Sequence, residues 1–304
     1  MKERDKFIGV NSIKFSRRFK DEEDCYKYIA DIKWENGYVC KHCGHTRYYQ
    51  GEKPYSRRCS RCRYDESPTA GTMFDKLKFS LLIAFHIAFK ISTKKKGMSS
   101  LELSEEFELR QKTCWAFKWK IQKAMQSTYT YPLEGDVHVD EFYIGGPDDQ
   151  KRGRSKGSKK LVQVALEVIP GKGVGRAYAR VIDDASSKSL QCLFDEHIAK
   201  DAHVITDEWN GYLPIMKQYP NMERRKSDEG NNFPDLHIHI MNIKGWLRGI
   251  HHHCTKEQLQ GYLDEYHFRY NRRNNMDTIF DSLIKRMVLY KPVRLVNNKL
   301  DVEA

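Results

Sequence analysis

Two Asp-Glu pairs, each following a short apolar segment typical of a β-strand, are the residues of this sequence best suited to metal chemistry. Asp140 and Glu141 lie in VHVDEFYIGG, and Asp207 and Glu208 lie in VITDEWNGY. Either pair alone would more simply cap a strand or face solvent. Carboxylates at the ends of neighbouring strands repel one another strongly unless a divalent cation lies between them. Together the pairs predict that Asp140 and Asp207 hold Mg²⁺ (or Mn²⁺), with Glu141 on the opposite face of its strand.

The chemistry that such a site would perform is phosphodiester displacement. Mg²⁺ prefers hard oxygen ligands and keeps several waters, so one or two protein carboxylates and a phosphate can complete its coordination shell. Two ions about 3.5–4 Å apart would activate an attacking hydroxyl and stabilise the departing oxygen. The sequence therefore predicts a site that cuts a polyanion.

A third ligand has two candidates. Asn242 lies at the start of a predicted helix in HIHIMNIKGWLRG, and its carbonyl oxygen can bind Mg²⁺ without adding charge. Glu265, in YLDEYHFRYNRR, is the rival carboxylate, although a buried ion pair with Arg269 four residues later is the simpler interpretation. Lys244 and Arg248 lie one turn apart on the Asn242 helix and are predicted to contact phosphate.

Several histidines lie on or near this predicted helix and are metal ligands by residue type. Imidazole matches a site of oxygen ligands poorly, so contact with the backbone or with DNA is the favoured interpretation. These residues are His237, His239, His251, His252 and His253.

Four of the eight cysteines form the pattern C-x2-C-x15-C-x2-C, which is the spacing of a zinc site. Two tight knuckles can bring four thiolates to about 2.3 Å from one tetrahedral Zn²⁺, and four sulfurs leave no open position for catalysis. Buried or free thiols are the alternative. The pattern predicts a structural zinc ribbon held by Cys40, Cys43, Cys59 and Cys62.

Three segments, most of whose polar residues are basic, are predicted to contact DNA. A solvated charged face is the alternative for each segment. One segment flanks the second cysteine pair. Another begins the second of two helices joined by a short turn, an arrangement similar to a helix-turn-helix. The last is a Gly-rich segment that is typical of a mobile loop and would clamp the DNA backbone. In chain order the residues are Arg57, Arg58, Arg61, Arg63; Gln111, Lys112, Thr113; Lys151, Arg152, Arg154, Lys156, Lys159 and Lys160.

The bulk properties favour a polyanionic partner. The formal net charge is +12 over 304 residues, which indicates nucleic acid first and acidic membranes second. The charged N-terminus lacks a secretion signal, and apolar runs stay short of the roughly 20 residues needed to span a bilayer. We therefore expect a soluble, cytoplasmic protein without a membrane partner, in which cysteines bind metal rather than form disulfides.

The predicted elements indicate an α/β architecture with a central mixed sheet that follows a zinc ribbon and a helical region. Strand-like segments occupy 137–139, 161–169, 176–182 and 203–206, and helical periodicity occupies 77–91, 187–200, 211–219 and 256–270. The expected domains are 1–70 with the ribbon, 71–130 with the helical pair, 131–290 with the catalytic sheet, and a tail of 291–304.

Many short blocks occur in the order found in one known family. They include CKHCG, CSRC, ESPTAGTMFDKLKFSLLIAFHIAF, KKGMSSLELS, KTCWAFKWKIQKAM, VDEFYIGG, RGRSKGSKK, TDEWNGY, NIKGWLRGIHHH and YLDEYHFRYNRR. On these residues the chain resembles IS1595-type (ISXO2-like) insertion-sequence transposases along nearly its whole length.

The resemblance implies a ribonuclease-H-like catalytic domain with two Mg²⁺ ions that cleaves DNA at element ends and joins it to a target. Asp140 and Asp207 match the first two catalytic positions, and Asn242 with Lys244 matches a subgroup that has asparagine in place of glutamate. The implied partners are the terminal inverted repeats, target DNA and further copies of the chain assembled on DNA, in a bacterial, nucleoid-associated setting. A related nuclease without strand transfer, or an inactive zinc-ribbon DNA-binding protein, are the alternatives.

Overall fold

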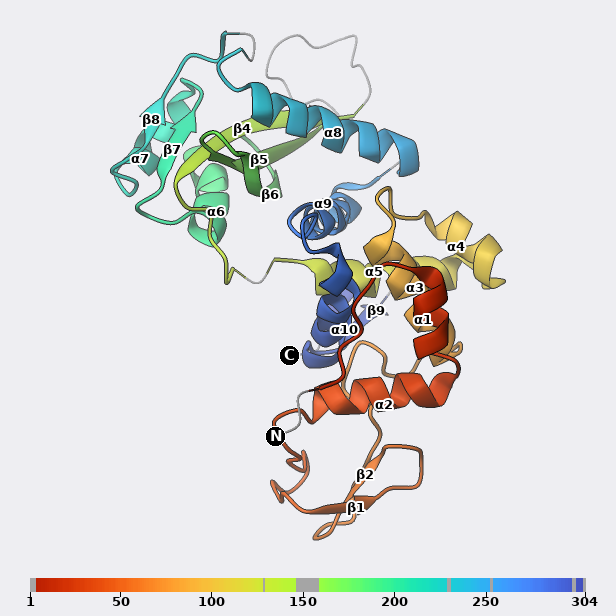
Figure 1. The fold of residues 1–304 in the computed structure, drawn as a ribbon. Helices are drawn as coiled ribbons and strands as arrows, with labels where there is room; N and C mark the ends of the chain where they lie inside the picture. Colours follow the sequence, from red (N-terminus) through yellow and green to blue (C-terminus); the bar gives the residue numbers. More distant parts are fainter. Residues whose placement is uncertain are drawn as a thin grey trace. The chain divides into compact units, whose positions relative to one another are not determined.

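The computed structural model describes residues 4–127, 129–145, 159–228, 231–251, 254–296 and 299–302. The chain divides into two compact units (Figure 1). The first contains the residues up to Met125 together with those from Asn274 onward, and the second contains Gln126 to Arg273. Two expected boundaries therefore differ: the ribbon and the helical region share one unit, and the catalytic unit ends near 273 rather than 290.

The first unit is a set of helices around an aromatic core. Phe280 lies at its centre, with ring centroids 5.6 Å from Phe7, 5.2 Å from Phe15 and 5.8 Å from Phe85. Fully burying a ring of this size contributes about 1.5–3 kcal/mol, which explains why the helix that carries Phe280 packs here. The helices are α1 (Ser12–Arg18), α2 (Glu22–Lys33), α3 (Leu81–Thr93), α4 (Ser100–Phe107), α5 (Gln111–Met125) and α10 (Ile279–Leu289).

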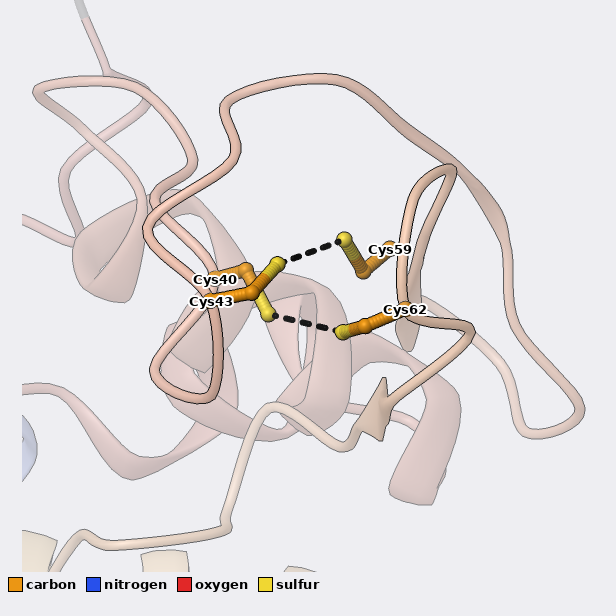
Figure 2. A group of neighbouring side chains, drawn as sticks. All are labelled: Cys40, Cys43, Cys59 and Cys62. Carbon is orange, nitrogen blue, oxygen red and sulfur yellow. Dashed lines mark hydrogen bonds between the residues drawn. The ribbon is translucent and has the colours of Figure 1, made fainter.

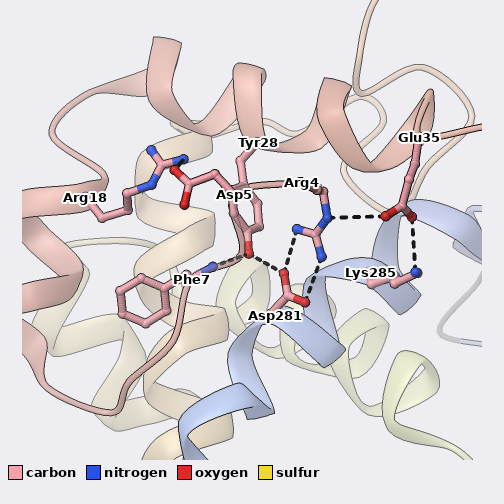
Figure 3. A network of polar contacts seen from close by, with 8 residues as sticks. All are labelled: Arg4, Asp5, Phe7, Arg18, Tyr28, Glu35, Asp281 and Lys285. Atoms are coloured by element: carbon pink, nitrogen blue, oxygen red, sulfur yellow. Dashed lines mark hydrogen bonds and ion pairs between the residues drawn. The ribbon is translucent and has the colours of Figure 1, made fainter. Parts of the chain in front are cut away.

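A polar network also connects the N-terminal segment to α10 (Figure 3). The Arg4 guanidinium lies 2.6 Å from a carboxylate oxygen of Asp281, which also accepts a hydrogen bond from the Tyr28 hydroxyl. The backbone N–H of Phe7 donates to the same hydroxyl at 3.0 Å. Because each charged group in this buried cluster has a partner, the cluster fixes which segments meet. The network and the aromatic core together explain why residues beyond 273 belong to the first unit.

Helices α4 and α5 form the predicted helical pair. Ser99 is the N-cap of α4: it accepts from the backbone of Glu102, and the Glu102 carboxylate accepts from the Ser99 backbone in return. α4 ends at Phe107, and its C-cap Glu108, with a φ of 51°, turns the chain before α5 begins at Gln111. None of the helices in the described residues is long and apolar enough to cross a membrane.

Short strands make up the remainder of the first unit. β1 (Tyr48–Gln50), β2 (Arg57–Cys59) and β3 (Asp65–Glu66) form an antiparallel sheet in that order. β9 (Val293–Val296) pairs with β10 (Lys299–Val302).

The second unit is built on a mixed five-stranded sheet, which confirms the expected fold class. The strands are β4 (Asp136–Ile144), β5 (Lys160–Ile169), β6 (Gly173–Ile182), β7 (His203–Thr206) and β8 (Glu223–Arg224), in the order β6-β5-β4-β7-β8. The first three pair antiparallel, whereas β7 runs parallel to β4 and β8 runs parallel to β7. This arrangement agrees with the ribonuclease-H-like sheet that the resemblance implies.

Helices cover both faces of this sheet (Figure 1). Alternate residues of β4 divide between two cores: Val137 and Val139 pack with one set of helices, and Phe142 packs with the other. α6 (Ser187–His197), η1 (Asn210–Tyr212) and α7 (Leu213–Met216) pack on the Val139 side, and α8 (Pro234–Ile250) and α9 (Lys256–Tyr270) pack on the Phe142 side. The side chains of β4 therefore reach α8 or α6 according to their parity.

Two buried histidines join α8 to α9. The Nε2 atoms of His239 and His267 lie 3.2 Å apart. His267 Nδ1 lies 2.8 Å from the carbonyl of Leu263, which can only accept, so Nδ1 carries the proton and His239 donates to His267 Nε2. Burial lowers the pKa of His267 to about 4 and that of His239 to about 2. Both rings are therefore neutral in the folded unit at neutral pH.

We predict that acid destabilises the second unit through this pair. The unfolded chain protonates these histidines below about pH 6.5, whereas the folded chain resists until about pH 4. The contribution of the pair to stability is therefore complete above pH 6.5 and falls as the pH drops toward 4. Calorimetry should show the Tm of this unit falling by roughly 5 °C or more between pH 7 and pH 5.

The matched variants are His267→Gln, in which the new side chain is uncharged at every pH, and His203→Gln, which replaces a partly exposed histidine. The first should flatten the dependence of Tm on pH, whatever its stability at pH 7, and the second should leave the dependence unchanged. Equal slopes in the wild type and His267→Gln would exclude the pair as the cause.

Candidate active site

Asp140 and Asp207 lie level with one another on neighbouring parallel strands. The register pairs the residue before Asp140 with the residue before Asp207, and adjacent strands lie about 4.8 Å apart. Phe142 and Ile205, each two residues away along the chain, pack with α8 and α9. By alternation both aspartates belong to the α8 face of the sheet. The sequence predicted both aspartates at strand ends. Asp207 does follow the end of β7, but β4 continues to Ile144, so Asp140 lies in the middle of its strand.

Backbone groups hold one oxygen of each carboxylate. Asp140 Oδ1 accepts from the N–H of Glu141 at 2.7 Å, and Asp207 Oδ1 accepts from the N–H of Trp209 at 3.0 Å. Within the described residues, the only group of three or more metal-binding side chains whose ligand atoms all lie within 4.8 Å of one another is the cysteine tetrad. Asp140 and Asp207 are therefore not part of a cluster of three metal-binding side chains among the described residues.

Glu141 lies on the opposite face of β4, as the alternation predicts, and there it meets a tyrosine that the sequence analysis did not identify. The buried hydroxyl of Tyr212 donates to the Glu141 carboxylate. Burial raises the pKa of Tyr212 well above its usual value, and the charges of Glu141, Asp140 and Asp207 raise it further. Tyr212 closes the segment TDEWNGY, so this bond ties the strand of Asp140 to the loop that follows Asp207.

Replacing Tyr212 by phenylalanine should therefore destabilise the second unit. The change removes the donor and leaves the half-buried Glu141 carboxylate poorly solvated, at a cost of about 1–3 kcal/mol. Urea unfolding measures the loss. Tyr219→Phe is the matched control, since Tyr219 is equally buried but its hydroxyl contacts the exposed Lys200 at 3.2 Å. Equal losses in the two variants would show that the bond to Glu141 has no special role.

One flank of α8 lies beside Asp140. His237 Nε2 lies 3.6 Å from Asp140 Oδ2, and Lys244 follows seven residues later, which is about two helical turns. Lys244 Nζ lies 5.4 Å from the centre of the Phe142 ring. Burial and the nearby Arg248 lower the pKa of Lys244, whereas Asp140 raises it. Two basic side chains of α8 are therefore placed beside Asp140. The sequence analysis did not place His237 here, although its i, i+7 spacing from Lys244 puts both on one flank of the helix.

The two candidates for the third ligand lie elsewhere. Asn242 is exposed on α8, and its position two residues before Lys244 places it about 200° around the helix from that side chain. Glu265 is fully buried in α9, where its carboxylate accepts from Arg269 at 2.7 Å. The ion pair considered for Glu265 is thus present. Arg248 is exposed on α8 near Lys244.

The remaining histidines near α8 have other contacts or lie outside the described residues. His239 is buried against His267, and the His251 ring stacks on Tyr262 with centroids 3.7 Å apart. His252 and His253 lie outside the described residues.

The four cysteines converge as the spacing predicts (Figure 2). The Sγ atoms of Cys40 and Cys62 lie 3.6 Å apart, as do those of Cys43 and Cys59. Tetrahedral Zn²⁺ with bonds of about 2.3 Å would place its sulfurs about 3.8 Å apart. Burial alone would raise the pKa of Cys40, but backbone N–H groups donate to its sulfur and bring the pKa down to about 6. The tetrad therefore fits a structural zinc ion.

The arginines of the ribbon divide into two groups. Arg57 is enclosed by aromatic rings, with its guanidinium 4.3 Å from the Trp34 ring and 4.2 Å from the Tyr48 ring, and burial lowers its pKa. This packing gives Arg57 a role in holding the ribbon on α2 rather than in contacting phosphate. Arg58 bonds Asp65 at 3.0 Å from an exposed position, and Arg61 and Arg63 are exposed.

The other predicted DNA contacts are partly described. Gln111 and Lys112 are exposed and Thr113 is half-buried in the first turn of α5, and their contact with DNA stays a prediction. Lys159 and Lys160 lie at the start of β5 and are half-buried. The remaining members of the basic loop lie outside the described residues: Lys151, Arg152, Arg154 and Lys156.

Comparisons with known proteins agree with this architecture. Residues 132–271 match the ISXO2-like transposase domain family, and residues 20–65 match the transposase zinc-ribbon domain family. A protein of Halobacterium salinarum described as an uncharacterized protein in transposable element ISH50 is 23% identical over 277 residues, which cover 83% of this chain and 92% of that protein. The two family matches lie in the order of the two units, and together they cover more than half of the chain. The protein therefore belongs to the IS1595-type (ISXO2-like) insertion-sequence transposases.

Proposed function

We propose that this transposase binds the ends of its insertion sequence, cuts a phosphodiester bond there and joins the released 3′-hydroxyl to target DNA. The observation that carries the proposal is the placement of Asp140 and Asp207, level on adjacent parallel strands and on the face covered by α8. Two carboxylates at the same level of adjacent strands repel one another, and a divalent cation between them removes that repulsion. The donor set contains carboxylate oxygens, which are the ligands of Mg²⁺ and Mn²⁺.

In this proposal the side chains around the carboxylates bind and orient DNA. Asp140 and Asp207 would hold the metal, which when bound would favour attack on the phosphorus and offset charge on the departing oxygen. Lys244, beside Asp140, and the exposed Arg248 would hold the phosphate that reacts. The Tyr212–Glu141 bond would keep the two aspartates level while DNA binds. Asn242 remains a predicted ligand, and its exposed position requires a change in α8 before its amide can reach the carboxylates.

DNA recognition is assigned to the first unit. A hollow of about 580 Å³ opens beside the first turns of α5. Among the described residues its lining has five cationic side chains, three aromatic ones and no acid, which suits a phosphate backbone beside an apolar sugar or base. The cationic residues are Lys76, Lys78, Arg110, Lys112 and Lys120. We propose that this hollow, with the exposed Arg61 and Arg63 of the ribbon, contacts the terminal repeats, and that two or more copies assemble there.

The hollow gives a test by salt dependence. A Lys78→Ala/Lys112→Ala variant should bind duplex DNA more weakly at every sequence tested. Its plot of log affinity against log salt should be shallower by about two, because each lost phosphate contact removes about 0.9 from the slope. The control is Lys14→Ala/Lys27→Ala, which removes two exposed lysines outside the hollow. An unchanged slope in the first variant would remove the hollow from the DNA-binding surface.

The function itself is tested with labelled duplex DNA taken from the sequence on each side of the gene, a target plasmid and Mg²⁺ or Mn²⁺. A product in which labelled end DNA is covalently joined to the plasmid supports the proposal. Cutting without joining would replace it with a nuclease, and binding without cutting would replace it with an inactive DNA-binding protein.

A further inference from the structure

We propose that the hollow beside α5 binds an unpaired nucleotide of the DNA, with the base against Phe79 and Trp115 and the phosphates on the cationic side chains of the lining. The inference rests on the proposed function, in which this hollow contacts the terminal repeats. It adds that the DNA is locally single-stranded where it meets the first unit. The protein would then favour element ends that are frayed or opened over ends that are fully paired.

The first observation is the size and shape of the hollow. Its volume of about 580 Å³ lies within the range of about 300–1,000 Å³ for pockets that enclose one small organic molecule. One nucleotide is a molecule of that size. A duplex instead receives a protruding helix or ribbon in its major groove, which is about 12 Å wide. A concave space therefore suits a nucleotide that has left the duplex.

The second observation is that two half-buried rings of the lining are each packed against a buried ring. Phe79 meets Phe117 edge-on, with ring centroids 5.3 Å apart and an interplanar angle of 83°. Trp115 lies beside Trp119, with ring centroids 5.6 Å apart. Rings fixed by such neighbours lose little conformational freedom when a base stacks on them. Every base has a flat apolar face, so this stacking would tolerate any sequence.

The third observation is the placement of charge around these rings. Lys76 and Lys78 are exposed in the segment before α3, and Lys112 is exposed in the first turn of α5. Lys120 is half-buried, and its ammonium group donates to the carbonyl of Met73 at 3.1 Å, which fixes it on the lining. Cations from two segments therefore surround the rings, as the phosphates on either side of one nucleotide require.

These features favour DNA that is already open. Taking a base out of a duplex costs stacking and pairing energy, and the cost is smallest for a base without a partner. Stacking and phosphate contacts in the hollow would be the same for both kinds of DNA. We therefore expect a single strand to occupy the hollow more tightly than a blunt duplex does.

The test uses the full-length, zinc-loaded protein and labelled tetrathymidylate, a single strand too short to pair, with binding followed by fluorescence anisotropy. Trp115→Leu should weaken binding by about tenfold or more, which is the loss expected for one stacked base. Trp115→Phe keeps a ring and should stay within a few-fold of the wild type. Trp246→Leu, the same change in a half-buried tryptophan of the second unit, should have no effect. Equal affinity in Trp115→Leu and the wild type would overturn the proposal.

A second measurement needs no variant and so does not depend on how a variant folds. Tetrathymidylate with one base replaced by iodouracil forms a crosslink under ultraviolet light with an aromatic side chain that it contacts. Mass spectrometry of the wild-type protein should place the crosslink on Phe79 or Trp115. Crosslinks confined to residues outside the lining would contradict the proposal.

Free nucleotides share the chemistry of this ligand and are distinguished by competition. Thymidine monophosphate has one base but lacks the neighbouring phosphates of a strand, so it should displace labelled tetrathymidylate at least about tenfold less well than the unlabelled strand does. Equal competition would identify a free nucleotide as the ligand and exclude DNA.

These outcomes are separable from failure of the proposed function. If Lys78→Ala/Lys112→Ala weakens duplex binding while Trp115→Leu binds tetrathymidylate as the wild type does, the hollow contacts paired DNA and the unpaired nucleotide is wrong. If neither variant changes the binding of either probe, the hollow has no part in DNA binding and both proposals for it fail.

Discussion

Asp140→Asn and Asp207→Asn are each expected to reduce DNA cleavage and joining by on the order of a thousandfold or more. Both carboxylates sit level at adjacent strands, and an amide in place of either removes the negative charge that would hold the cation. Metal stabilisation of the reacting oxygens amounts to several kcal/mol, and each 1.36 kcal/mol is a factor of ten in rate. The measurement is the yield of cut and joined end DNA over time at saturating Mg²⁺ and at saturating Mn²⁺.

Binding of end DNA should survive these two substitutions, because the proposed recognition surface lies in the first unit. Asp136→Asn is the matched control, since Asp136 begins the same strand but its carboxylate bonds His203 at 2.8 Å. It should keep activity within a few-fold of the wild type. Full activity in Asp140→Asn or in Asp207→Asn would refute the assignment of the site.

Loss of zinc should have the second large effect. Cys40→Ser/Cys43→Ser removes two of the four thiolates, and apparent binding free energies of structural zinc are about 10–16 kcal/mol. The ribbon has only three short strands and a small buried cluster around Trp34, Tyr38 and Cys59, so it should unfold without the ion. We expect zinc content to fall from one ion per chain to none, with new protease cleavage between residues 38 and 66 and weaker DNA binding.

Cys192→Ser tests whether this effect belongs to the tetrad. Cys192 is a partly exposed free thiol of α6, so its replacement should leave zinc content, protease resistance and DNA binding unchanged. If the Cys40→Ser/Cys43→Ser variant bound end DNA as tightly as the wild type, the ribbon would have no part in recognition.

Features that depend on neighbouring residues could be predicted from the sequence. The cysteine spacing identified the tetrad, the short turn before Gln111 separated the helices α4 and α5, and apolar segments identified four of the five strands of the sheet, without β8. These patterns work because a cap, a knuckle or a strand is determined by residues a few positions apart.

Features that depend on distant residues could not be predicted. The charge run of the ribbon did not reveal that Arg57 packs between Trp34 and Tyr48, since those rings become neighbours only when the ribbon folds. The common level of Asp140 and Asp207 depends on the register of β4 with β7, which alternation alone does not set. The position of Asn242 depends on how α8 is rotated on the sheet, and five buried side chains decide that: Leu236, His239, Ile240, Ile243 and Leu247.

The assignment of α10 to the first unit has a consequence for how the protein is made. Phe280 and Asp281 complete an aromatic and ionic core whose other members precede residue 90, whereas the sheet unit is continuous in the chain. On a ribosome, which synthesises chains from the N-terminus, the sheet can fold as soon as it emerges, but the helical core of the first unit must wait for the codons of α10. A polypeptide terminated before α10 would therefore carry an assembled sheet unit without the finished helical unit to which we assign DNA recognition.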